Sequence, residues 1–324
     1  MSTKLRVAVV GAGVFGRNHV RVLSRMADVE LVAVVDLNVK RAQEVAGDHG
    51  VPACSALDEL PGEIDAAVVA TPTVTHETVV EELLGSGIDV LVEKPIADSA
   101  EAGERLTHLA NENGQILQVG HLERFNPAVV ALANECTVPL FFEVHRLSVF
   151  TARSLDVDVV LDLMIHDLDI VLSLTSETPK EIRAAGISVL SPKVDIANVR
   201  LAFESGCVAN LTASRISTEQ VRKLRLFQPG EYLSVDYQRQ ELSKARVSAD
   251  TLPHGFEFLK MPVQRAEPLQ LELEAFVKAV RQRSRPKVDG EQATNALRVA
   301  EEILATIKEH AHIVSETIRG RGNH

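Results

Sequence analysis

Tryptophan is absent from this sequence of 324 residues, and aromatic residues make up only 4% of it. Positive charge is also in deficit, because 34 Lys and Arg face 45 Asp and Glu and leave a net charge of -11. A nucleic-acid-binding protein needs a basic surface or aromatic side chains that stack on bases. We therefore expect no nucleic-acid partner and no anionic membrane partner, and any phosphorylated ligand must be held by local groups.

Cysteine is rare as well, and Cys54, Cys136 and Cys207 are too far apart to form a pair with metal-ligand spacing. Isolated cysteines in odd number are typical of reduced thiols, so we predict neither a disulfide framework nor a metal site. The most apolar segment, residues 159–174, contains three aspartates and a histidine, which excludes a membrane span. The first residues do not resemble a signal peptide, and we predict a cytoplasmic protein.

A chain of this length fits two domains of about 150 residues. In the first third, short β-branched runs alternate with mostly amphipathic stretches, which is typical of βαβ units around a parallel sheet. After about residue 122 the pattern becomes period-two alternation, as in residues 198–203, which predicts antiparallel strands. The predicted fold class is α/β. A Rossmann domain with a doubly wound parallel sheet covers residues 1–122. The second domain, residues 123–324, is predicted to be α+β with antiparallel strands whose two faces differ, and its closing helices can pack back on the first domain; the large open sheet is what the family resemblance described below implies.

The six residues from Gly11 to Gly16 read GAGVFG and connect the first strand to a helical pattern. In such a turn Gly11 allows the tight bend, Gly13 lets a pyrophosphate approach the backbone, and Gly16 lets helix and strand pack closely. The helix N-terminus then offers N–H groups and its positive dipole end to phosphates. We predict a dinucleotide site that includes Val14 and Phe15. The alternative is a glycine turn with a solvated aspartate at Asp36.

Asp36 ends the second strand, twenty residues beyond Gly16. At this place a carboxylate accepts hydrogen bonds from a ribose 2'-hydroxyl and repels a 2'-phosphate. Neither Leu37 nor Asn38 supplies a cation, so the sequence favours NAD over NADP. The nearby Arg41 leaves the NADP alternative open.

Two further segments, ATPTVTH at residues 70–76 and VLVEKP at residues 90–95, end apolar runs where an open α/β sheet binds ligands. Together with the glycine motif they resemble the Gfo/Idh/MocA family of oxidoreductases. The resemblance continues through DLMIHDLD at residues 162–169, similar to the family's DxGxHxxD, and through residues 289–297, so it spans essentially the whole chain.

The family resemblance implies a Rossmann domain that binds NAD or NADP and a second domain whose open sheet mediates dimers or tetramers. It also implies that residues of the two strand-end segments contact the cofactor: Thr71, Thr73, His76, Glu93 and Lys94. Met164 departs from the family pattern, because many members have glycine there. A differently filled turn near the substrate is expected.

Oxidation of a secondary alcohol needs a base for the hydroxyl proton, and Lys94 and His166 are the candidates. Lys94 ends a strand, and the following Pro95 fixes the backbone so that the amine points toward the cofactor crevice. The alternative for Lys94 is a solvated loop lysine. The sequence does not decide which of the two residues is the base.

His166 belongs to a polar stripe on an otherwise apolar helical segment. Asp162, four residues earlier, is placed to orient the imidazole and is predicted to act in catalysis and in substrate binding. Asp169 is either a supporting acid or a structural one, and a structural histidine is the alternative for His166 itself. The remaining members of the stripe are Asp158 and Ser173.

Residues 120–127, GHLERFNP, join the two predicted domains, where a substrate pocket is expected. Arg124 and Asn126 are predicted to hold sugar hydroxyls or phosphates. Lys94 and His166 are also predicted to bind the substrate, at the reacting alcohol. The alternative is a capped helix start with Pro127 in an early position. Four arginines are candidate diphosphate partners, with surface or inter-strand charges as the alternative: Arg153, Arg215, Arg222 and Arg225.

The segments GHLERFNPA and DLMIHDLDI together resemble the nucleotide-sugar branch of the family. That resemblance implies NAD-dependent oxidation of the 3-hydroxyl of UDP-N-acetylglucosamine, giving a 3-keto sugar nucleotide for a 3-amino sugar of lipid A. Two alternatives remain: an inositol or free-sugar dehydrogenase, and a non-catalytic NAD-binding regulator. The presence of both Lys94 and His166 argues against the regulator.

A stripe of small and mixed side chains on one strand suits a partner sheet better than bulk solvent, and we predict a homodimer or homotetramer. A solvated sheet face is the alternative. The residues of the stripe are Val208, Asn210, Thr212, Ser214 and Ile216.

Overall fold

The computed structural model describes residues 3–151, 157–247 and 255–321. These residues form two compact units, which are described separately. The first unit contains the chain up to Leu122 together with Glu267–Thr294, and the second contains Glu123–Ala266 and the chain from Asn295 onward. None of the helices in the described part of the chain is long and apolar enough to cross a membrane.

The first unit is built on a parallel sheet of six strands in the order β3-β2-β1-β4-β5-β6, which confirms the predicted Rossmann arrangement. Its strands are β1 (Leu5–Val10), β2 (Val29–Val35), β3 (Ala53–Cys54), β4 (Ala66–Val69), β5 (Asp89–Glu93) and β6 (Leu117–Gly120). Its helices are α1 (Val14–Leu23), α2 (Val39–Gly47), α3 (His76–Gly85), α4 (Ala100–Asn113) and α7 (Pro268–Gln282), with short 3-10 turns η1 (Leu57–Glu59) and η2 (Thr73–Thr75). Helices on both faces explain why the strands read as continuous apolar runs.

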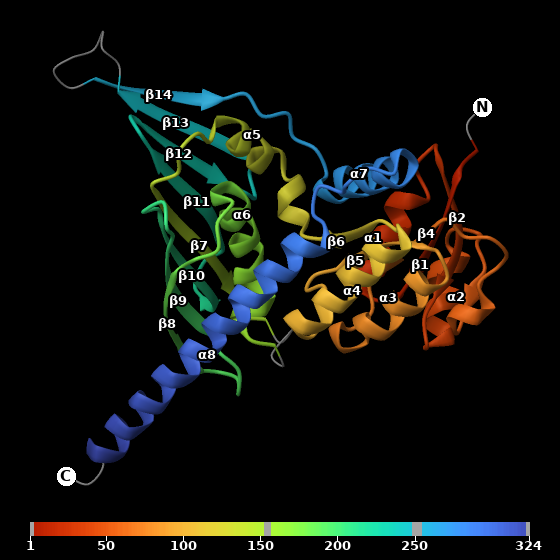
Figure 1. Ribbon diagram of the computed structural model, residues 1–324, viewed down its shortest axis with the longest axis horizontal. Coiled ribbons are helices and arrows are strands. Elements are labelled where there is room, and N and C mark those ends of the chain that lie inside the picture. The colour runs from red at the N-terminus through yellow and green to blue at the C-terminus, as the bar shows by residue number, and fades with distance from the viewer. Residues whose placement is uncertain (1–2, 152–156, 248–254, 322–324) are drawn as a thin grey trace. The chain divides into compact units, whose positions relative to one another are not determined.

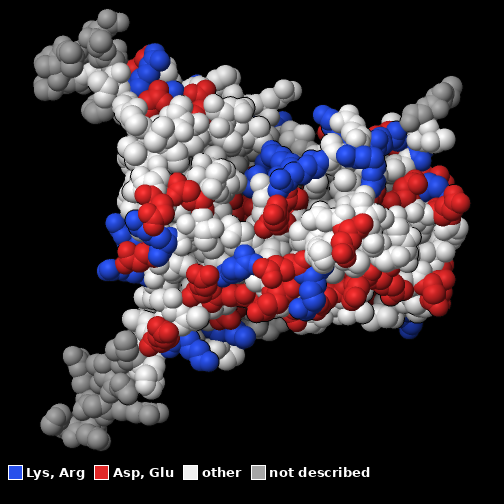
Figure 2. Space-filling model, viewed as in Figure 1, with Lys and Arg blue, Asp and Glu red and all other residues white. Residues whose placement is uncertain are grey.

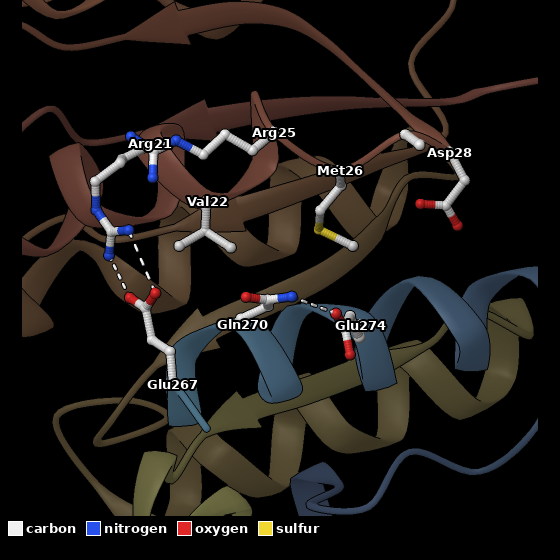
Figure 3. A pocket seen from close by; sticks show the side chains of 9 residues that line it. Arg21, Val22, Arg25, Met26, Asp28, Glu267, Gln270 and Glu274 are labelled. Atoms are coloured by element: carbon white, nitrogen blue, oxygen red, sulfur yellow. Dashed lines mark hydrogen bonds and ion pairs between the residues drawn. The ribbon is translucent and has the colours of Figure 1, made fainter. Parts of the chain in front are cut away.

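Helix α7 belongs to the first unit although it lies far along the chain. Its residues Leu273, Phe276 and Val277 are buried in the same apolar core as β1 and α1. Arg21 of α1 donates two hydrogen bonds to the Glu267 carboxylate just before α7, beside a groove of about 250 Å³ (Figure 3). The first domain was predicted to end at residue 122, whereas the first unit also contains residues 267–294. The prediction allowed for this, because it stated that the closing helices can pack back on the first domain.

The second unit has a mixed sheet of eight strands in the order β14-β13-β12-β11-β7-β10-β9-β8. All neighbours are antiparallel except β7 and β10, which pair in parallel, so the predicted antiparallel sheet is confirmed with that one exception. The strands are β7 (Phe141–Val149), β8 (Glu181–Ile187), β9 (Ile196–Ala202), β10 (Val208–Ser217), β11 (Val221–Gln228), β12 (Glu231–Asp236), β13 (Glu241–Val247) and β14 (Phe256–Met261).

In the part of the chain that the structure describes, helices cover one face of this sheet and leave the other open (Figure 1). They are α5 (Pro127–Glu135), a π-helical turn (Val160–Met164) continued by α6 (Ile165–Thr175), and the later part of α8 (Gly290–Arg321); a 3-10 turn η3 (Leu122–Phe125) precedes α5. Alternate strand residues such as Val199 and Leu201 are fully buried against these helices, whereas Asn198 and Arg200 are exposed on the other face. The predicted open sheet is confirmed. The predicted stripe on β10 holds for Val208–Thr212, but Ser214 is buried and the pairing with β7 shifts beyond it.

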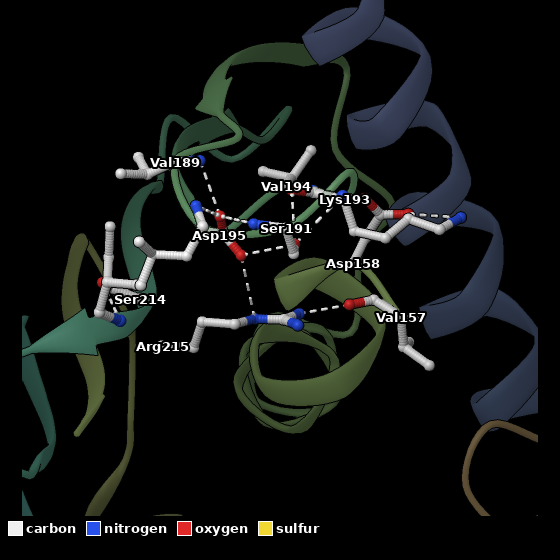
Figure 4. Close-up of polar contacts among 11 residues, drawn as sticks. Val157, Asp158, Val189, Ser191, Lys193, Val194, Asp195, Ser214 and Arg215 are labelled. Carbon is white, nitrogen blue, oxygen red and sulfur yellow. Dashed lines mark hydrogen bonds and ion pairs between the residues drawn. The ribbon is translucent and has the colours of Figure 1, made fainter. Parts of the chain in front are cut away.

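A fully buried carboxylate organises the loop between β8 and β9 (Figure 4). Asp195 accepts backbone N–H groups of Val189, Leu190 and Ser191 at 2.7, 2.6 and 3.0 Å, and Arg215 lies 3.8 Å away. Burial raises the pKa of Asp195, but the hydrogen bonds to the loop outweigh burial and hold the pKa at about 2.

We expect Asp195→Ala to lower the free energy of unfolding by about 2–4 kcal/mol at pH 7, since three N–H groups and Arg215 lose their acceptor. Because the folded pKa lies below the unfolded value of ~3.9, this stability is present above pH 4 and is lost as the pH falls toward 2. Urea unfolding at pH 7, 4 and 3 measures the difference between wild type and variant. As control, Asp236→Ala removes an aspartate that accepts one exposed N–H at 3.0 Å and should cost under about 1 kcal/mol. Equal losses in the two variants would contradict this account.

Candidate functional site

The glycine turn lies at the carboxyl edge of the first sheet, between β1 and α1. Gly11 has φ +99°, and a Cβ there would lie 2.5 Å from the carbonyl oxygen of Ala70 on the adjacent segment. A Cβ on Gly16 would lie 1.7 Å from the carbonyl oxygen of Gly11. A Cβ on Gly13 would meet no protein atom within 4 Å. The fold thus requires Gly11 and Gly16, while the space at Gly13 is open to an approaching ligand.

The same edge carries exposed apolar side chains that the fold itself does not need. Val14 and Phe15 at the start of α1 are 64% and 62% exposed, and Leu37 and Val74, which follow β2 and β4, are 90% and 75% exposed. The N-cap of α1, Gly13, has no side-chain cap, so the first N–H groups of the helix are available to an anion. Apolar surface for a base and N–H groups for phosphates fit a dinucleotide at this edge.

Asp36 holds the glycine turn from the end of β2. Its carboxylate accepts the Ala12 N–H and the Asn38 N–H, each at 2.8 Å, and its side chain is 10% exposed. Arg41 lies 3.5 Å from one of its oxygens. A carboxylate has about four lone-pair sites, so Asp36 retains capacity to accept a ribose hydroxyl in addition to these backbone groups.

His76 does not face a ligand, contrary to the prediction that it binds cofactor. Its side chain is buried, and Nδ1 and Nε2 lie 2.9 and 3.0 Å from the carbonyl oxygens of Pro95 and Thr71. Burial lowers the pKa of His76, although both carbonyl contacts raise it. His76 connects the two strand-end segments, whereas Thr71 and Thr73 are half-buried at the edge itself.

Lys94 follows the end of β5 and is half-buried, and its peptide bond to Pro95 is cis. The adjacent Glu93 contacts His19 of α1, with Oε1 2.7 Å from Nε2. Burial raises the pKa of Glu93, but His19 and the Lys94 ammonium outweigh it and lower the pKa overall. Glu93 therefore supports the Lys94 turn as an anion held by α1.

Glu272 of α7 was not among the predicted site residues. It is fully buried, and burial together with the negative charge of Glu93 raises its pKa well above the usual range. Neither of its carboxyl oxygens has a hydrogen-bond partner among the described residues. A glutamate in a helical pattern gives no sign that the helix returns to the Rossmann sheet, so the sequence carried no signal for this group.

In the second unit, α6 is fixed by a buried ion pair. Asp167 accepts hydrogen bonds from Arg146 of β7 at 2.6 and 2.9 Å and from the Tyr237 hydroxyl at 3.1 Å. Arg146 also donates to Glu123 at 3.1 Å and lies over the Tyr237 ring. Burial alone would lower the pKa of Arg146, but the two carboxylates raise it strongly. Sequence reasoning missed this network because it depends on sheet register.

His166 occupies a distinct position on the anchored helix. All residues from Met164 to Leu172 are buried except His166, which is half-buried. Asp162 lies in the π-helical turn before α6, where the Ile165 N–H bonds back five residues to Val160. The orientation of the His166 imidazole by Asp162 stays a prediction. Met164, the departure from the family pattern, packs into the apolar core.

Two other members of the stripe have structural partners. Asp158 accepts the Val194 N–H at 2.8 Å, and the Ser173 hydroxyl donates to the Ile170 carbonyl at 2.7 Å. Asp169 is buried, with one carboxylate oxygen 3.3 Å from the Arg124 guanidinium. The roles predicted for Asp169 and Arg124 stay predictions.

Asn126 is a helix cap rather than a substrate ligand, contrary to the prediction. Its side chain is buried, accepts the Ala128 N–H at 3.1 Å, and donates to Glu123 and to the Tyr237 carbonyl. With Pro127 in the first turn, this is the capped helix start that the sequence left as the alternative.

The four candidate phosphate-binding arginines have different surroundings. Arg153 lies outside the described residues. Arg225 pairs with Glu143 at 2.9 Å on the open sheet face, as an inter-strand charge. Arg215 and Arg222 line a cavity of about 300 Å³ together with Asp162. Among the residues that the structure describes, no group of three or more His, Cys, Asp or Glu is placed to hold a metal ion.

The surface of the protein is acidic, so an anionic ligand has to be bound by positively charged or N–H groups within its own site. Helices α3 and α4 carry exposed glutamates, and acidic side chains gather over them on the face drawn in Figure 2. An anionic ligand gains no long-range attraction from such a surface. A Rossmann sheet with this glycine turn, an acidic residue after β2 and a lysine after β5 is typical of dinucleotide-dependent oxidoreductases.

Comparison with known proteins identifies the family. Residues 5–121 match the model for the oxidoreductase family with an NAD-binding Rossmann fold, and residues 136–228 match the Gfo/Idh/MocA C-terminal domain. The chain is 34% identical to UDP-N-acetylglucosamine 3-dehydrogenase from Acidithiobacillus ferrooxidans, over 94% of this chain and 97% of that enzyme. A solved structure of that enzyme covers 95% of this chain and 99% of its own, with TM-score 0.90.

An inositol 2-dehydrogenase from Pseudarthrobacter chlorophenolicus is 28% identical, over 65% of this chain and 67% of that protein. This protein belongs to the Gfo/Idh/MocA family of oxidoreductases, and its cofactor is NAD.

We expect Asp36→Ser to weaken NAD binding by about 1–3 kcal/mol and to weaken NADP binding less, because a ribose acceptor is lost while repulsion of a 2'-phosphate is relieved. Calorimetric titration of both cofactors measures the difference. Asp36→Asn is the matched control, since its amide keeps one oxygen for the Ala12 N–H. Unchanged affinity for both cofactors in Asp36→Ser would show that Asp36 does not contact the ribose.

Proposed function

We propose that this protein uses NAD to oxidise the 3-hydroxyl of UDP-N-acetylglucosamine to the 3-keto sugar nucleotide. The observation that carries the proposal is the similarity to an enzyme of that name across 94% of this chain and 97% of that enzyme. The cavity beside Asp162 supports it further, because two arginines line that cavity and a free polyol offers no anion for them.

The first unit fits NAD by the open space at Gly13, the exposed apolar residues Val14, Phe15, Leu37 and Val74, and the acceptor Asp36. When bound, NAD supplies the acceptor for the two electrons and hydrogen that leave the alcohol carbon. The chain's own residues then have two tasks. They hold the substrate, and they take the hydroxyl proton.

Lys94 and His166 are proposed as the proton-transfer and polarising groups. If Lys94 is the base, its amine must be neutral during the cycle, and if His166 is the base, Lys94 stabilises the developing alkoxide as a cation. Asp162 is proposed to contact the substrate from the cavity side. Asp167 does not compete for the reaction, because Arg146 and Tyr237 already occupy its oxygens.

The two alternative functions differ from the proposed one in the substrate or in the absence of turnover. An inositol or free-sugar dehydrogenase is favoured by the inositol 2-dehydrogenase relatives. The one from Rhizobium meliloti matches 95% of this chain and 98% of its own length, at 26% identity against 34% for UDP-N-acetylglucosamine 3-dehydrogenase. A non-catalytic NAD-binding regulator would show cofactor binding without turnover of any alcohol. A cytoplasmic location is proposed on the three free cysteines, two of which are buried.

A panel of UDP-N-acetylglucosamine, other nucleotide sugars, inositols and free sugars, assayed with NAD by the absorbance of the reduced cofactor, tests the reaction. We expect turnover of UDP-N-acetylglucosamine with kcat/KM at least tenfold above every uncharged polyol. Reduction of NAD by inositols alone would establish the first alternative instead.

The open sheet face is proposed to hold a second copy of the chain in a homodimer or homotetramer. Phe141, Phe227 and Tyr232 form a row across three adjacent strands on that face, with ring centroids 5.8 and 5.0 Å apart, and Phe227 is 38% exposed. Exposed aromatic rows are typical of interfaces. Light scattering at micromolar protein should give at least the mass of a dimer, and a monomeric mass would refute this.

We expect Lys94→Met and His166→Asn each to reduce kcat about 10²–10⁴-fold with NAD affinity largely retained, because the glycine turn and Asp36 carry the dinucleotide. The pH profile of kcat/KM distinguishes the roles. Loss of the base removes the rising limb, whereas loss of the helper lowers the rate and keeps that limb. Arg183→Met, in an exposed pair with Glu181, is the control. Near-wild-type turnover in both variants would disprove the assignment and favour the regulator.

A further inference from the structure

Two arginines lie directly opposite each other on the helix-covered face of the second sheet. Arg146 of β7 and Arg222 of β11 are register partners in an antiparallel pair. Like charges at such positions repel and destabilise a sheet unless each has its own counter-charge. We therefore compare the counter-charges that surround the two guanidinium groups.

Arg146 is fully compensated within the protein. It donates to both oxygens of Asp167 and to Glu123, and the Tyr237 ring lies 5.1 Å from its guanidinium carbon. These groups are themselves held, because Tyr237 donates to Asp167 and Asn126 donates to Glu123. Among the described residues, Glu123 and Asp167 are hydrogen-bonded to Arg146 and not to Arg222.

Arg222 has no such compensation. Its Nε is shielded from solvent and has no hydrogen-bond partner among the described residues, and its guanidinium forms no ion pair with them. Burial and the charge of Arg146 lower the pKa of Arg222, while Glu123, Asp167 and Asp162 oppose this only at a distance. An unmatched cation is thus maintained at a costly position.

The charge of Arg222 faces a cavity of about 300 Å³, lined also by Arg215, Asp162, Ser148 and Gln220. Arg215 is 6% exposed and is held by the Val157 carbonyl and the nearby Asp195 (Figure 4). Its guanidinium is therefore fixed before any ligand arrives. Arg215 has Asp195 as its counter-charge, whereas Arg222 forms no ion pair with the described residues, and cavities of this size hold small ligands.

We propose that this cavity binds the diphosphate of the nucleotide-sugar substrate, with Arg222 as the residue that pairs with it. The inference rests on the proposed function, whose reaction it extends to substrate selection. A guanidinium fork matches phosphate oxygens bidentately, and a ligand anion supplies the counter-charge that the fold withholds. Uncharged polyols cannot supply it, so Arg222 determines specificity.

The test compares Arg222→Met with Arg246→Met, which replaces an exposed arginine paired with Glu257 in the same sheet. Calorimetric titration of the NAD-loaded proteins uses UDP, inorganic pyrophosphate, N-acetylglucosamine 1-phosphate and uridine. We expect Arg222→Met to weaken UDP about tenfold to hundredfold and to leave uridine and NAD affinity unchanged. Arg246→Met should stay within about twofold of wild type. The KM for UDP-N-acetylglucosamine should rise in Arg222→Met more than kcat falls.

Stability provides an independent readout, because removing one of two opposed arginines should leave Tm unchanged or raise it. If Arg222→Met does not melt cooperatively, Arg222→Lys replaces it, and its UDP affinity should lie below wild type because the fork is lost. Equal UDP binding in wild type and the folded Arg222 variant would overturn the subsite, as would failure of UDP and pyrophosphate to bind wild type. Arg222-dependent UDP binding without turnover of UDP-N-acetylglucosamine would sustain the subsite and refute the proposed reaction.

Discussion

The ion pair between Arg146 and Asp167 sets the geometry on which the second unit's chemistry depends. Both side chains are buried, with two hydrogen bonds of 2.6 and 2.9 Å between them, and loss of either would leave a buried charge without its partner. Because Asp167 must face the sheet, its neighbour His166 is rotated by about 100° to the half-buried side of α6. Arg222 lies opposite Arg146 on β11 and forms no ion pair with the described residues, and we propose that a ligand supplies its counter-charge.

The first unit depends on close backbone contact in the same way. The turn at Gly11 presses against the Ala70 carbonyl, so the glycine turn and the end of β4 have to be built together. His76 then joins the β4 end to the β5 end, and Glu93 joins the β5 end to α1 through His19. These contacts hold the ends of three strands together at one edge of the sheet. Lys94 is positioned there by its neighbours, because Glu93 contacts His19 and the Pro95 carbonyl contacts His76.

Local patterns were sufficient to predict the features whose cause is local. The glycine turn, Asp36 at the end of β2, the change from parallel to mostly antiparallel strands and the open sheet face all follow from periodicity and turn chemistry. Asn126 and His76 were misassigned because a capping amide and a buried imidazole have the same letters as ligand-binding ones. The π-helical turn, the return of α7 and the opposition of Arg146 and Arg222 depend on tertiary contacts or on strand register, which no single segment encodes.

The central claim is that the hydrogen leaving C3 of a nucleotide sugar is transferred directly to NAD. UDP-N-acetylglucosamine deuterated at C3, incubated with the enzyme and NAD and followed by mass spectrometry of the reduced cofactor, tests this claim directly. The account predicts reduced cofactor that carries one deuterium and a product that is a ketone at C3. Reduced cofactor without deuterium, or a ketone at another carbon, would contradict it.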